Sequence, residues 1–347
     1  MNRTLTFAFP GRLDLNTGGY AYDRRVIAGL PARGWSVTPL SLGEGFPAPE
    51  DAALADAEAM LSDLPDGSIV LVDGLAFGVM DRWAAREARR LSIVALVHHP
   101  LALETGLTEE QTRSLRERER AALSHARHVV VTSPMTAREL VHGYDVPERA
   151  ITVALPGTDR APRSAGSGEV PLILSVGTLT RRKGHDVLLQ ALKQIEDLPW
   201  RASIIGSRDL DPKTATELER QLARLGLTGR VTLEGERADT RPAFAQADIF
   251  ALATRYEGYG MVFAEALSQG LPIVSCQAGA VPEVVPSSAG LLVPVDDVDA
   301  FAGALRHLVS KSDERRRYAD GAWQAGQALP GWDDTCATIA RVLEESL

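Results

Sequence analysis

A cationic turn is the first feature of this sequence with recognisable chemistry. Arg181, Arg182 and Lys183 stand next to one another, after the apolar run Leu172–Val176 and directly before a segment of helical periodicity. Cations at the start of a helix bind anions well, because the helix dipole and the free backbone N–H groups add to their attraction. We predict a phosphate or diphosphate site here. The residues leave open whether Arg181 or Arg182 contacts it, and a solvated basic turn is the simpler alternative.

Two glutamates separated by seven residues form the second feature. Glu257 lies in a loop after an apolar run, where Gly258 and Gly260 allow a tight turn with close backbone approach to a ligand. Glu265 falls about one turn into a helix that we expect to begin near Met261. A carboxylate accepts hydrogen bonds from two hydroxyl groups, as a sugar or a ribose diol offers. The apolar neighbours of Glu265 disfavour the alternative of a solvated surface glutamate, because burying an unpaired carboxylate is costly.

The third feature combines a histidine pair with a glycine pair. His98 and His99 directly follow the run Ser92–Val97, and Gly18 and Gly19 stand between an apolar run and a helix-like segment. A neutral imidazole at a strand end can hydrogen-bond a sugar hydroxyl or support developing charge, and glycine lets a phosphate approach the backbone. Which histidine faces a sugar stays open. No second cluster of His, Cys or carboxylates has ligand spacing, so we predict no metal site.

Short apolar runs rich in Val, Ile and Leu position these residues. Such runs are typical of strands buried on both faces of a parallel sheet, and helical periodicity between them indicates right-handed βαβ units. In the first half we expect strands at Thr4–Phe9, Trp35–Leu40, Ser68–Val72, Ser92–Val97, His128–Thr132 and Ile151–Ala154. In the second half we expect them at Leu172–Val176, Ala202–Ile205, Val231–Leu233, Ile249–Leu252, Pro272–Ser275 and Gly290–Val293.

The alternation predicts an α/β protein with two doubly wound domains. The segment Ala161–Gly168, rich in Pro, Gly and small residues, is the best linker candidate. We therefore expect domains at residues 1–163 and 169–331. Ligands bind beyond the carboxyl ends of strands in open α/β sheets, so two Rossmann-like domains facing across a cleft would place the site there.

Composition excludes several classes of protein. The chain has 347 residues and a net charge of −9, which argues against a general nucleic-acid binder. No run approaches the roughly 20 apolar residues of a spanning helix, so any membrane contact would be peripheral. The two cysteines imply no disulfide framework. We expect a cytoplasmic protein.

The sequence resembles the family-four retaining glycosyltransferases of GT-B fold over nearly its whole length. The motifs that carry the resemblance are Glu257 and Glu265 in their Tyr-Glu-Gly-Tyr-Gly-Met context, the stretch Val176–Gly184, the stretch Gly279–Glu283 and the segment near Trp332. One departure is Thr178, which stands where the family often has arginine. We expect Arg182 to supply that charge. The resemblance also implies that a final helix, residues 332–347, packs back on the first domain.

The resemblance implies a role for each matching residue. His98, Lys183, Arg182 and Glu257 would be catalytic. The donor, a UDP- or GDP-linked sugar, would contact Gly18, Gly19, Gly177, Arg182, Lys183, Glu257, Gly258, Tyr259, Gly260, Met261 and Glu265. Within this set, Glu257 would hold sugar hydroxyls, Glu265 the ribose diol, and Lys183 with Arg182 the diphosphate.

The resemblance further implies transfer with retained anomeric configuration to a carbohydrate, lipid or small-molecule acceptor, without a cofactor or metal. The strings Asp209-Leu-Asp211 and Asp297-Val-Asp299 look like helix-capping acids rather than cation ligands. Two alternatives stay open: a nucleotide-sugar epimerase or hydrolase on the same fold, and a non-catalytic protein that binds sugar nucleotides. A dinucleotide-dependent dehydrogenase is disfavoured, because no Gly-x-Gly-x-x-Gly string stands at a strand–helix junction.

Overall fold

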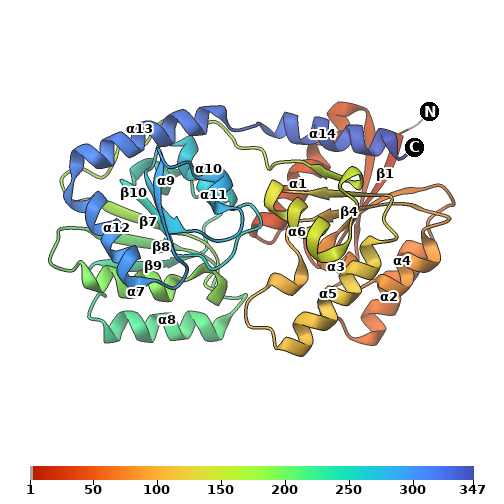
Figure 1. The fold of residues 1–347 in the computed structure, drawn as a ribbon, viewed down its shortest axis with the longest axis horizontal. Coiled ribbons are helices and arrows are strands. Elements are labelled where there is room, and N and C mark those ends of the chain that lie inside the picture. Colours follow the sequence, from red (N-terminus) through yellow and green to blue (C-terminus); the bar gives the residue numbers. More distant parts are fainter. Residues whose placement is uncertain (1–2) are drawn as a thin grey trace. The chain divides into compact units, whose positions relative to one another are not determined.

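The computed structural model describes residues 3–347 and divides them into two compact units. Of the described residues, the first unit comprises 3–157 together with Pro330–Leu347, and the second comprises Thr158–Leu329. Residues 1 and 2, which the sequence assigns to the first domain, lie outside the described part of the chain. Each unit contains a six-stranded parallel sheet. Figure 1 shows helices packed around each of the two sheets.

The first unit is built on a sheet of order β2-β1-β3-β4-β5-β6. Its strands are β1 (Arg3–Phe9), β2 (Trp35–Ser41), β3 (Ile69–Asp73), β4 (Ser92–Val97), β5 (His128–Val131) and β6 (Ile151–Val153). Its helices are α1 (Gly18–Gly29), α2 (Asp51–Ser62), α3 (Gly74–Phe77), α4 (Asp81–Glu87), α5 (Glu109–Leu123), α6 (Pro134–Tyr144) and α14 (Trp332–Glu345). Because β1 lies between β2 and β3, the strand order reverses at the β1–β3 pair.

The helix α14 lies beside α1 on the first unit (Figure 1). The ring of Tyr22 in α1 meets the ring of Trp332 edge-on, with 5.8 Å between centroids. Ile339 and Leu343 on the inner face of α14 are fully buried. Ser92 of β4 donates a hydrogen bond of 2.9 Å to the carbonyl of Ser346, just beyond the helix. This segment is therefore part of the core of the first unit.

The second unit is built on a sheet of order β12-β11-β10-β7-β8-β9, so its strand order reverses at the β7–β10 pair. Its strands are β7 (Leu172–Val176), β8 (Arg201–Ile205), β9 (Val231–Gly235), β10 (Ile249–Leu252), β11 (Ile273–Cys276) and β12 (Gly290–Val293). Its helices are α7 (His185–Gln194), α8 (Pro212–Arg224), α9 (Arg241–Gln246), α10 (Met261–Ser268), α11 (Val281–Val284), α12 (Val298–Ser310) and α13 (Ser312–Ala328).

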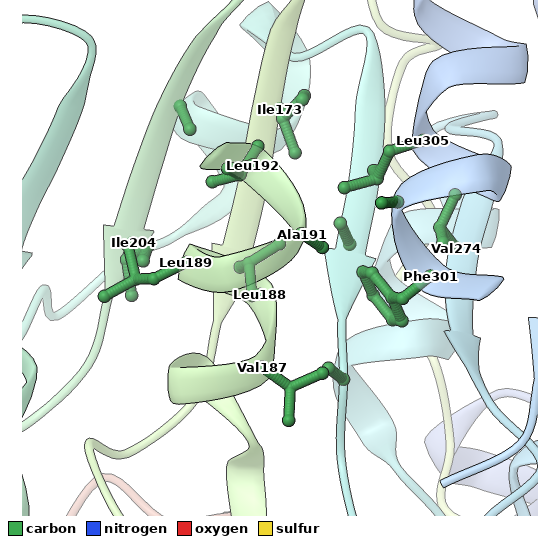
Figure 2. Close-up of a cluster of buried hydrophobic side chains, with 14 of the residues drawn as sticks. Ile173, Val187, Leu188, Leu189, Ala191, Leu192, Ile204, Val274, Phe301 and Leu305 are labelled. Carbon is green, nitrogen blue, oxygen red and sulfur yellow. The ribbon is translucent and has the colours of Figure 1, made fainter. Parts of the chain in front are cut away.

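Both faces of the second sheet are covered. On one face, Figure 2 shows Leu188 and Leu192 of α7 and Phe301 and Leu305 of α12 packed over the strands. On the opposite face, Phe250 of β10 contacts the aromatic rings of Phe244 in α9 and Phe263 in α10, at centroid distances of 5.5 and 5.6 Å. Strands covered on both faces read as continuous apolar runs, which is why the sequence revealed them.

Each of the twelve expected strands is present, with ends that differ by no more than about two residues from the prediction. The acids at 211 and 297 cap helices as expected: Asp211 accepts the backbone N–H of Thr214, and Asp297 accepts that of Ala300. Within residues 3–347, no helix combines the length and the apolarity needed to cross a membrane.

A buried glutamate ties α5 to the segment that follows β4. Glu119 is 1% exposed, and its Oε2 accepts the backbone N–H of Leu101 at 2.9 Å, whereas its Oε1 is buried without a hydrogen-bond partner. Burial raises the pKa of Glu119 from 4.5 to about 8. The carboxyl group is therefore protonated in the folded protein at pH values where it ionises in the unfolded chain.

We predict that Glu119→Gln changes the pH dependence of stability. Between pH 4.5 and about 8 the folded state binds one more proton at this site, so stability falls by up to about 1.4 kcal/mol per pH unit as the pH rises. Glutamine keeps the acceptor for Leu101 but does not titrate. The variant should therefore gain stability relative to the native protein from pH 5 to pH 8 in urea unfolding. Glu117→Gln, an exposed position on the same helix, is the control. Parallel pH profiles for Glu119→Gln and the native protein would contradict the prediction.

Candidate functional site

The expected phosphate-binding turn and the expected acidic loop lie next to each other, beyond the carboxyl ends of two central strands of the second sheet. The turn follows β7 and the loop follows β10, and these two strands are hydrogen-bonded neighbours at the point where the strand order reverses. In parallel sheets the loops at such a point diverge to opposite faces and leave room for a ligand. The strand order therefore brings together two motifs that lie more than 70 residues apart in the chain.

Lys183 and Glu257 form the centre of this site. The Nζ atom of Lys183 lies 2.7 Å from Oε1 of Glu257, and Nη1 of Arg182 lies 3.5 Å from Oε2 of the same carboxylate. Arg182 also donates a hydrogen bond of 3.0 Å to the carbonyl of Tyr256. The side chain of Arg181 is exposed. Of the two arginines left open by the sequence, Arg182 is therefore the one beside the carboxylate.

Glu257 is ionised in this arrangement although it is only 4% exposed. Burial by itself raises the pKa of Glu257, but the charges of Lys183 and Arg182 outweigh burial and lower it below its usual value. Thr254 also donates a hydrogen bond of 2.9 Å to Oε1. Oε2 stays 3.5 Å from Nη1 of Arg182, and a carboxylate oxygen in such a contact can also accept a hydroxyl group.

Arg255 holds the cationic turn against the loop after β10. Its backbone N–H donates to the carbonyl of Arg182 at 2.7 Å, and its guanidinium group binds both oxygens of Asp186 and one oxygen of Asp296. Paired ion contacts of this kind fix the orientation of both partners. Arg255 lies two residues before Glu257, but no local pattern in the sequence distinguishes it as a site residue.

The segment from Gly258 to Glu265 connects the carboxylate to α10. Gly260 has a φ of +89° directly before the helix, a conformation that favours glycine. Tyr259 is buried, Met261 begins α10, and Gly258 lies between Glu257 and Tyr259.

Glu265, on the first turn and a half of α10, is in a different electrostatic environment from Glu257. Burial and, to a smaller extent, the negative charges of Asp159 and Asp239 together raise the pKa of Glu265 to about 7, against the opposing effect of Arg241. The two glutamates therefore differ in charge near neutral pH, since Glu257 stays ionised and Glu265 is partly protonated.

Gly177 packs against the stem of Lys183. A β-carbon placed on Gly177 would lie 3.2 Å from Cδ of Lys183, which is a tight contact. The carbonyl oxygen of Gly177 is also 3.2 Å from Nε2 of His185 at the start of α7. The glycine thus leaves room for the lysine side chain along the turn.

In the first unit, the predicted residues gather at the carboxyl ends of β1, β3 and β4. Gly18 and Gly19 form the first turn of α1, and the α-carbon of Gly19 lies against the ring of His98, because a β-carbon there would be 3.3 Å from Cδ2. The ring of Tyr22 meets His98 edge-on at 5.3 Å, and the hydroxyl of Thr132 donates a hydrogen bond of 3.1 Å to the carbonyl of His98.

Two aspartates that were not predicted from the sequence lie beside the same ring nitrogen of His98. Nε2 of His98 lies 3.1 Å from Oδ1 of Asp23 in α1 and 3.6 Å from Oδ2 of Asp73 at the end of β3. Asp73 carried a signal, because it follows a predicted strand as His98 does; Asp23, inside a helix, carried none. His99 instead pairs with Glu104 at 3.4 Å.

Two features of the structure bear on what the sequence suggests for this histidine. Burial lowers the pKa of His98, but the charges of Asp23 and Asp73 and the hydrogen bond to Asp23 outweigh burial and raise the pKa above its ordinary value, which favours the cationic form more than in a free imidazole. The sequence indicated no cluster with metal-ligand geometry. Among the described residues, however, Asp23, Asp73 and His98 offer ligand atoms that all lie within 4.8 Å of one another.

Comparison with known protein families agrees with the site. Residues 22–161 match the family described as Glycosyltransferase Family 4, and residues 170–311 match the family described as Glycosyl transferases group 1.

Curated relatives carry the same type of activity in their names. The D-inositol 3-phosphate glycosyltransferase of Xylanimonas cellulosilytica is 28% identical over 286 residues, which cover 77% of this chain and 68% of that protein. The GDP-mannose-dependent alpha-(1-6)-phosphatidylinositol monomannoside mannosyltransferase of Mycolicibacterium smegmatis is 34% identical over 179 residues, 48% of this chain and 45% of that protein.

Solved structures show the same fold. Sucrose-phosphate synthase from Thermosynechococcus elongatus superimposes with a TM-score of 0.82 at 20% identity, covering 98% of both chains. HepE of Anabaena in complex with UDP-glucose superimposes with a TM-score of 0.79 at 18% identity, covering 98% of this chain and 99% of that one.

The chain has two α/β units, each with a parallel six-stranded sheet, and a cation–carboxylate site where the strand order of the second sheet reverses. Together with the comparisons, this fold and site define a glycosyltransferase of GT-B fold that uses a nucleotide sugar as donor. The chain belongs to the group 1, or family 4, glycosyltransferases.

Proposed function

We propose that this protein transfers a hexosyl group from a UDP- or GDP-linked donor, with retained anomeric configuration, to a hydroxyl group of a carbohydrate, lipid or small-molecule acceptor. The observation that carries the proposal is the 2.7 Å contact between Nζ of Lys183 and Oε1 of Glu257. A nucleotide sugar joins a diphosphate directly to a sugar ring. An anion-binding cation beside a hydroxyl-binding carboxylate matches the two sides of that bond.

Each predicted residue takes a role in this proposal. Lys183 and Arg182, with the backbone at Gly177, bind the diphosphate, and Glu257 binds donor-sugar hydroxyls. Glu265 binds the ribose diol. Further donor contacts come from Gly258, Tyr259, Gly260 and Met261 in the second unit, and from Gly18, Gly19 and His98 in the first.

The proposed reaction exchanges one bond at the anomeric carbon for another. The bond from that carbon to the β-phosphate oxygen breaks, and a bond to the acceptor oxygen forms on the same face of the sugar. The acceptor proton passes to the leaving phosphate oxygen, which yields a nucleoside diphosphate. Negative charge develops on the leaving oxygen, and fixed cations beside it lower the barrier. Lys183 and Arg182 supply those cations without a metal ion.

The printed names of relatives support the range of donors and acceptors. HepE was solved with UDP-glucose, and the Mycolicibacterium smegmatis relative is named for GDP-mannose and a phosphatidylinositol mannoside. The Xylanimonas cellulosilytica relative is named for inositol 3-phosphate. We propose a cytoplasmic location, which the free thiols of Cys276 and Cys336 support. Any membrane contact is proposed to be peripheral.

The test is a donor screen followed by product analysis. UDP, GDP, ADP and their glucose and mannose conjugates are added in a thermal-shift assay with EDTA present. A matching nucleotide at about 100 times its dissociation constant should stabilise the protein by about 2.7 kcal/mol. The matching sugar donor is then incubated with inositol phosphate and simple glycosides, and the anomeric configuration of the product is read by NMR coupling constants.

The proposal predicts an acceptor-dependent glycoside with the configuration of the donor. Formation of free sugar or of an epimerised donor at the same rate with and without acceptor would identify a hydrolase or epimerase instead. Binding of sugar nucleotides without any turnover across the acceptor panel would favour a non-catalytic protein. A strict requirement for a divalent cation would contradict the metal-independent mechanism.

A further inference from the structure

The environment of His98 contains more buried negative charge than one imidazole can neutralise. Asp23 is fully buried and Asp73 is 3% exposed, and both carboxyl groups face the same ring nitrogen. Two ionised carboxylates at such a distance repel each other strongly when water is excluded. A buried pair of this kind is stable when one carboxyl group keeps its proton.

One buried oxygen atom of Asp23, which lacks a hydrogen-bond partner among the described residues, indicates where that proton would form a hydrogen bond. Oδ1 of Asp23 bonds Nε2 of His98, but Oδ2 of Asp23 is buried without a hydrogen-bond partner among the described residues. Asp73 uses Oδ1 to accept the backbone N–H of Leu75 at 2.6 Å. A proton on Asp73 would turn its carboxyl group into a donor to Asp23 and satisfy both groups.

The direction of the pKa shift of Asp73 agrees with this geometry. Burial raises the pKa of Asp73, the nearby carboxyl group of Asp23 raises it further, and His98 opposes them only in part. The other titratable groups facing the cluster are Tyr20 and Tyr22 of α1, whose pKa values are both raised, mainly by burial. Neither tyrosine therefore adds charge near neutral pH.

We propose that Asp23 and Asp73 are positioning residues for His98: they share one proton, accept the Nε2–H of the imidazolium, and so leave Nδ1–H to donate a hydrogen bond to a substrate oxygen. This inference rests on the proposed function where it gives His98 a part in sugar transfer. The protonation state of Asp23, Asp73 and His98 does not depend on that function. Tyr22 and Gly19 restrict the ring further, because both lie against it.

The shared proton makes the two aspartates unequal, and this provides a sharp test. Asparagine at position 73 imitates a protonated aspartate, since its amide NH₂ can donate to Asp23 while its oxygen still accepts from Leu75. Asparagine at position 23 removes the charge that Nε2–H binds. Asp23→Asn should therefore lower kcat at least about tenfold with little change in the donor KM, and Asp73→Asn should lower kcat clearly less than Asp23→Asn does.

Nitrogen NMR of the full chain, with the His98 signals assigned from His98→Gln, reads the imidazole directly. The native protein and Asp73→Asn should both show a cationic ring at pH 7, and Asp23→Asn should shift its titration midpoint downward. Glu104→Gln is the control, because it should move the signals of His99 and leave those of His98 in place.

Several outcomes would overturn the inference. Equal losses of kcat in the two aspartate variants would exclude the shared proton. If Asp23→Asn does not fold, the native protein decides: a His98 midpoint at or below 6.5, or an Asp73 carboxyl carbon that titrates near 3.8, contradicts the proposal. Zn²⁺ added to chelator-treated protein should leave the His98 signals unchanged, and a stoichiometric shift would identify a cation site instead.

The same experiments separate this inference from the proposed function. Full activity of His98→Gln would remove His98 from the reaction, yet the NMR titrations would still report on the shared proton. Conversely, a neutral His98 in a protein that transfers sugar would end the positioning proposal and leave the glycosyltransferase activity untouched.

Discussion

Lys183→Ala should lower kcat for sugar transfer by about 100- to 1,000-fold, the usual cost of removing one fixed electrostatic contact to a developing oxyanion. It should also weaken binding of the nucleoside diphosphate product, because Lys183 contributes to the same anion site in the ground state. Steady-state kinetics and calorimetric titration with UDP and GDP measure the two effects. The matched control is Lys193→Ala on α7, whose lysine forms an exposed ion pair with Glu196.

The loss of Lys183 has a second consequence that separates catalysis from folding. Glu257 would remain buried with a weaker counter-charge, so its pKa should rise and the protein should unfold at lower temperature. The double variant Lys183→Ala/Glu257→Gln removes the unpaired charge and should recover stability without recovering turnover. Lys183→Ala with native kcat and native nucleotide affinity would show that the phosphate assignment is wrong.

Glu257→Gln should have the opposite effect on nucleotide binding. The amide keeps the shape of the side chain but no longer neutralises Lys183 and Arg182, so UDP or GDP should bind at least as tightly as to the native protein. Transfer should nevertheless fall about 10- to 100-fold in kcat/KM, since a hydrogen bond to a charged acceptor contributes roughly 1.5–3 kcal/mol.

The comparison of the two variants is more informative than either alone. Lys183→Ala and Glu257→Gln both reduce transfer, but only the first should weaken binding of the nucleotide without its sugar. Glu196→Gln, the exposed partner of Lys193, is the control for the glutamate change. If Glu257→Gln weakened UDP and GDP as much as Lys183→Ala does, the carboxylate would be supporting the phosphate site rather than binding the sugar.

The strands and the two motifs of the second unit could be predicted because their signals are local. Runs such as Leu172–Val176 and Ile249–Leu252 are continuous and apolar, as buried parallel strands must be. The 2.7 Å contact of Lys183 with Glu257 needed one further fact, the adjacency of β7 and β10. Strand order depends on packing between distant segments, and no local pattern in the sequence encodes it.

The cluster around His98 shows why the rest could not be predicted. Asp23 lies inside a helix, where a single acidic residue is ordinary, and only the fold turns it toward the ends of β3 and β4. The charge state of His98 then follows from two carboxyl groups that are 75 and 25 residues away in the chain. The local sequence pattern indicates the histidine, but the two carboxyl groups that raise its pKa are not visible in that pattern.

The position of α14 has a consequence for how the protein forms during synthesis. The ribosome makes all of residues 158–329 after the six strands of the first unit and before α14, whose buried Ile339 and Leu343 complete that unit. The unit that begins first is therefore finished last. The apolar surface of α1 that packs against α14 stays exposed to chaperones or to neighbouring nascent chains until α14 leaves the exit tunnel, whereas the second unit can fold as soon as its own residues emerge.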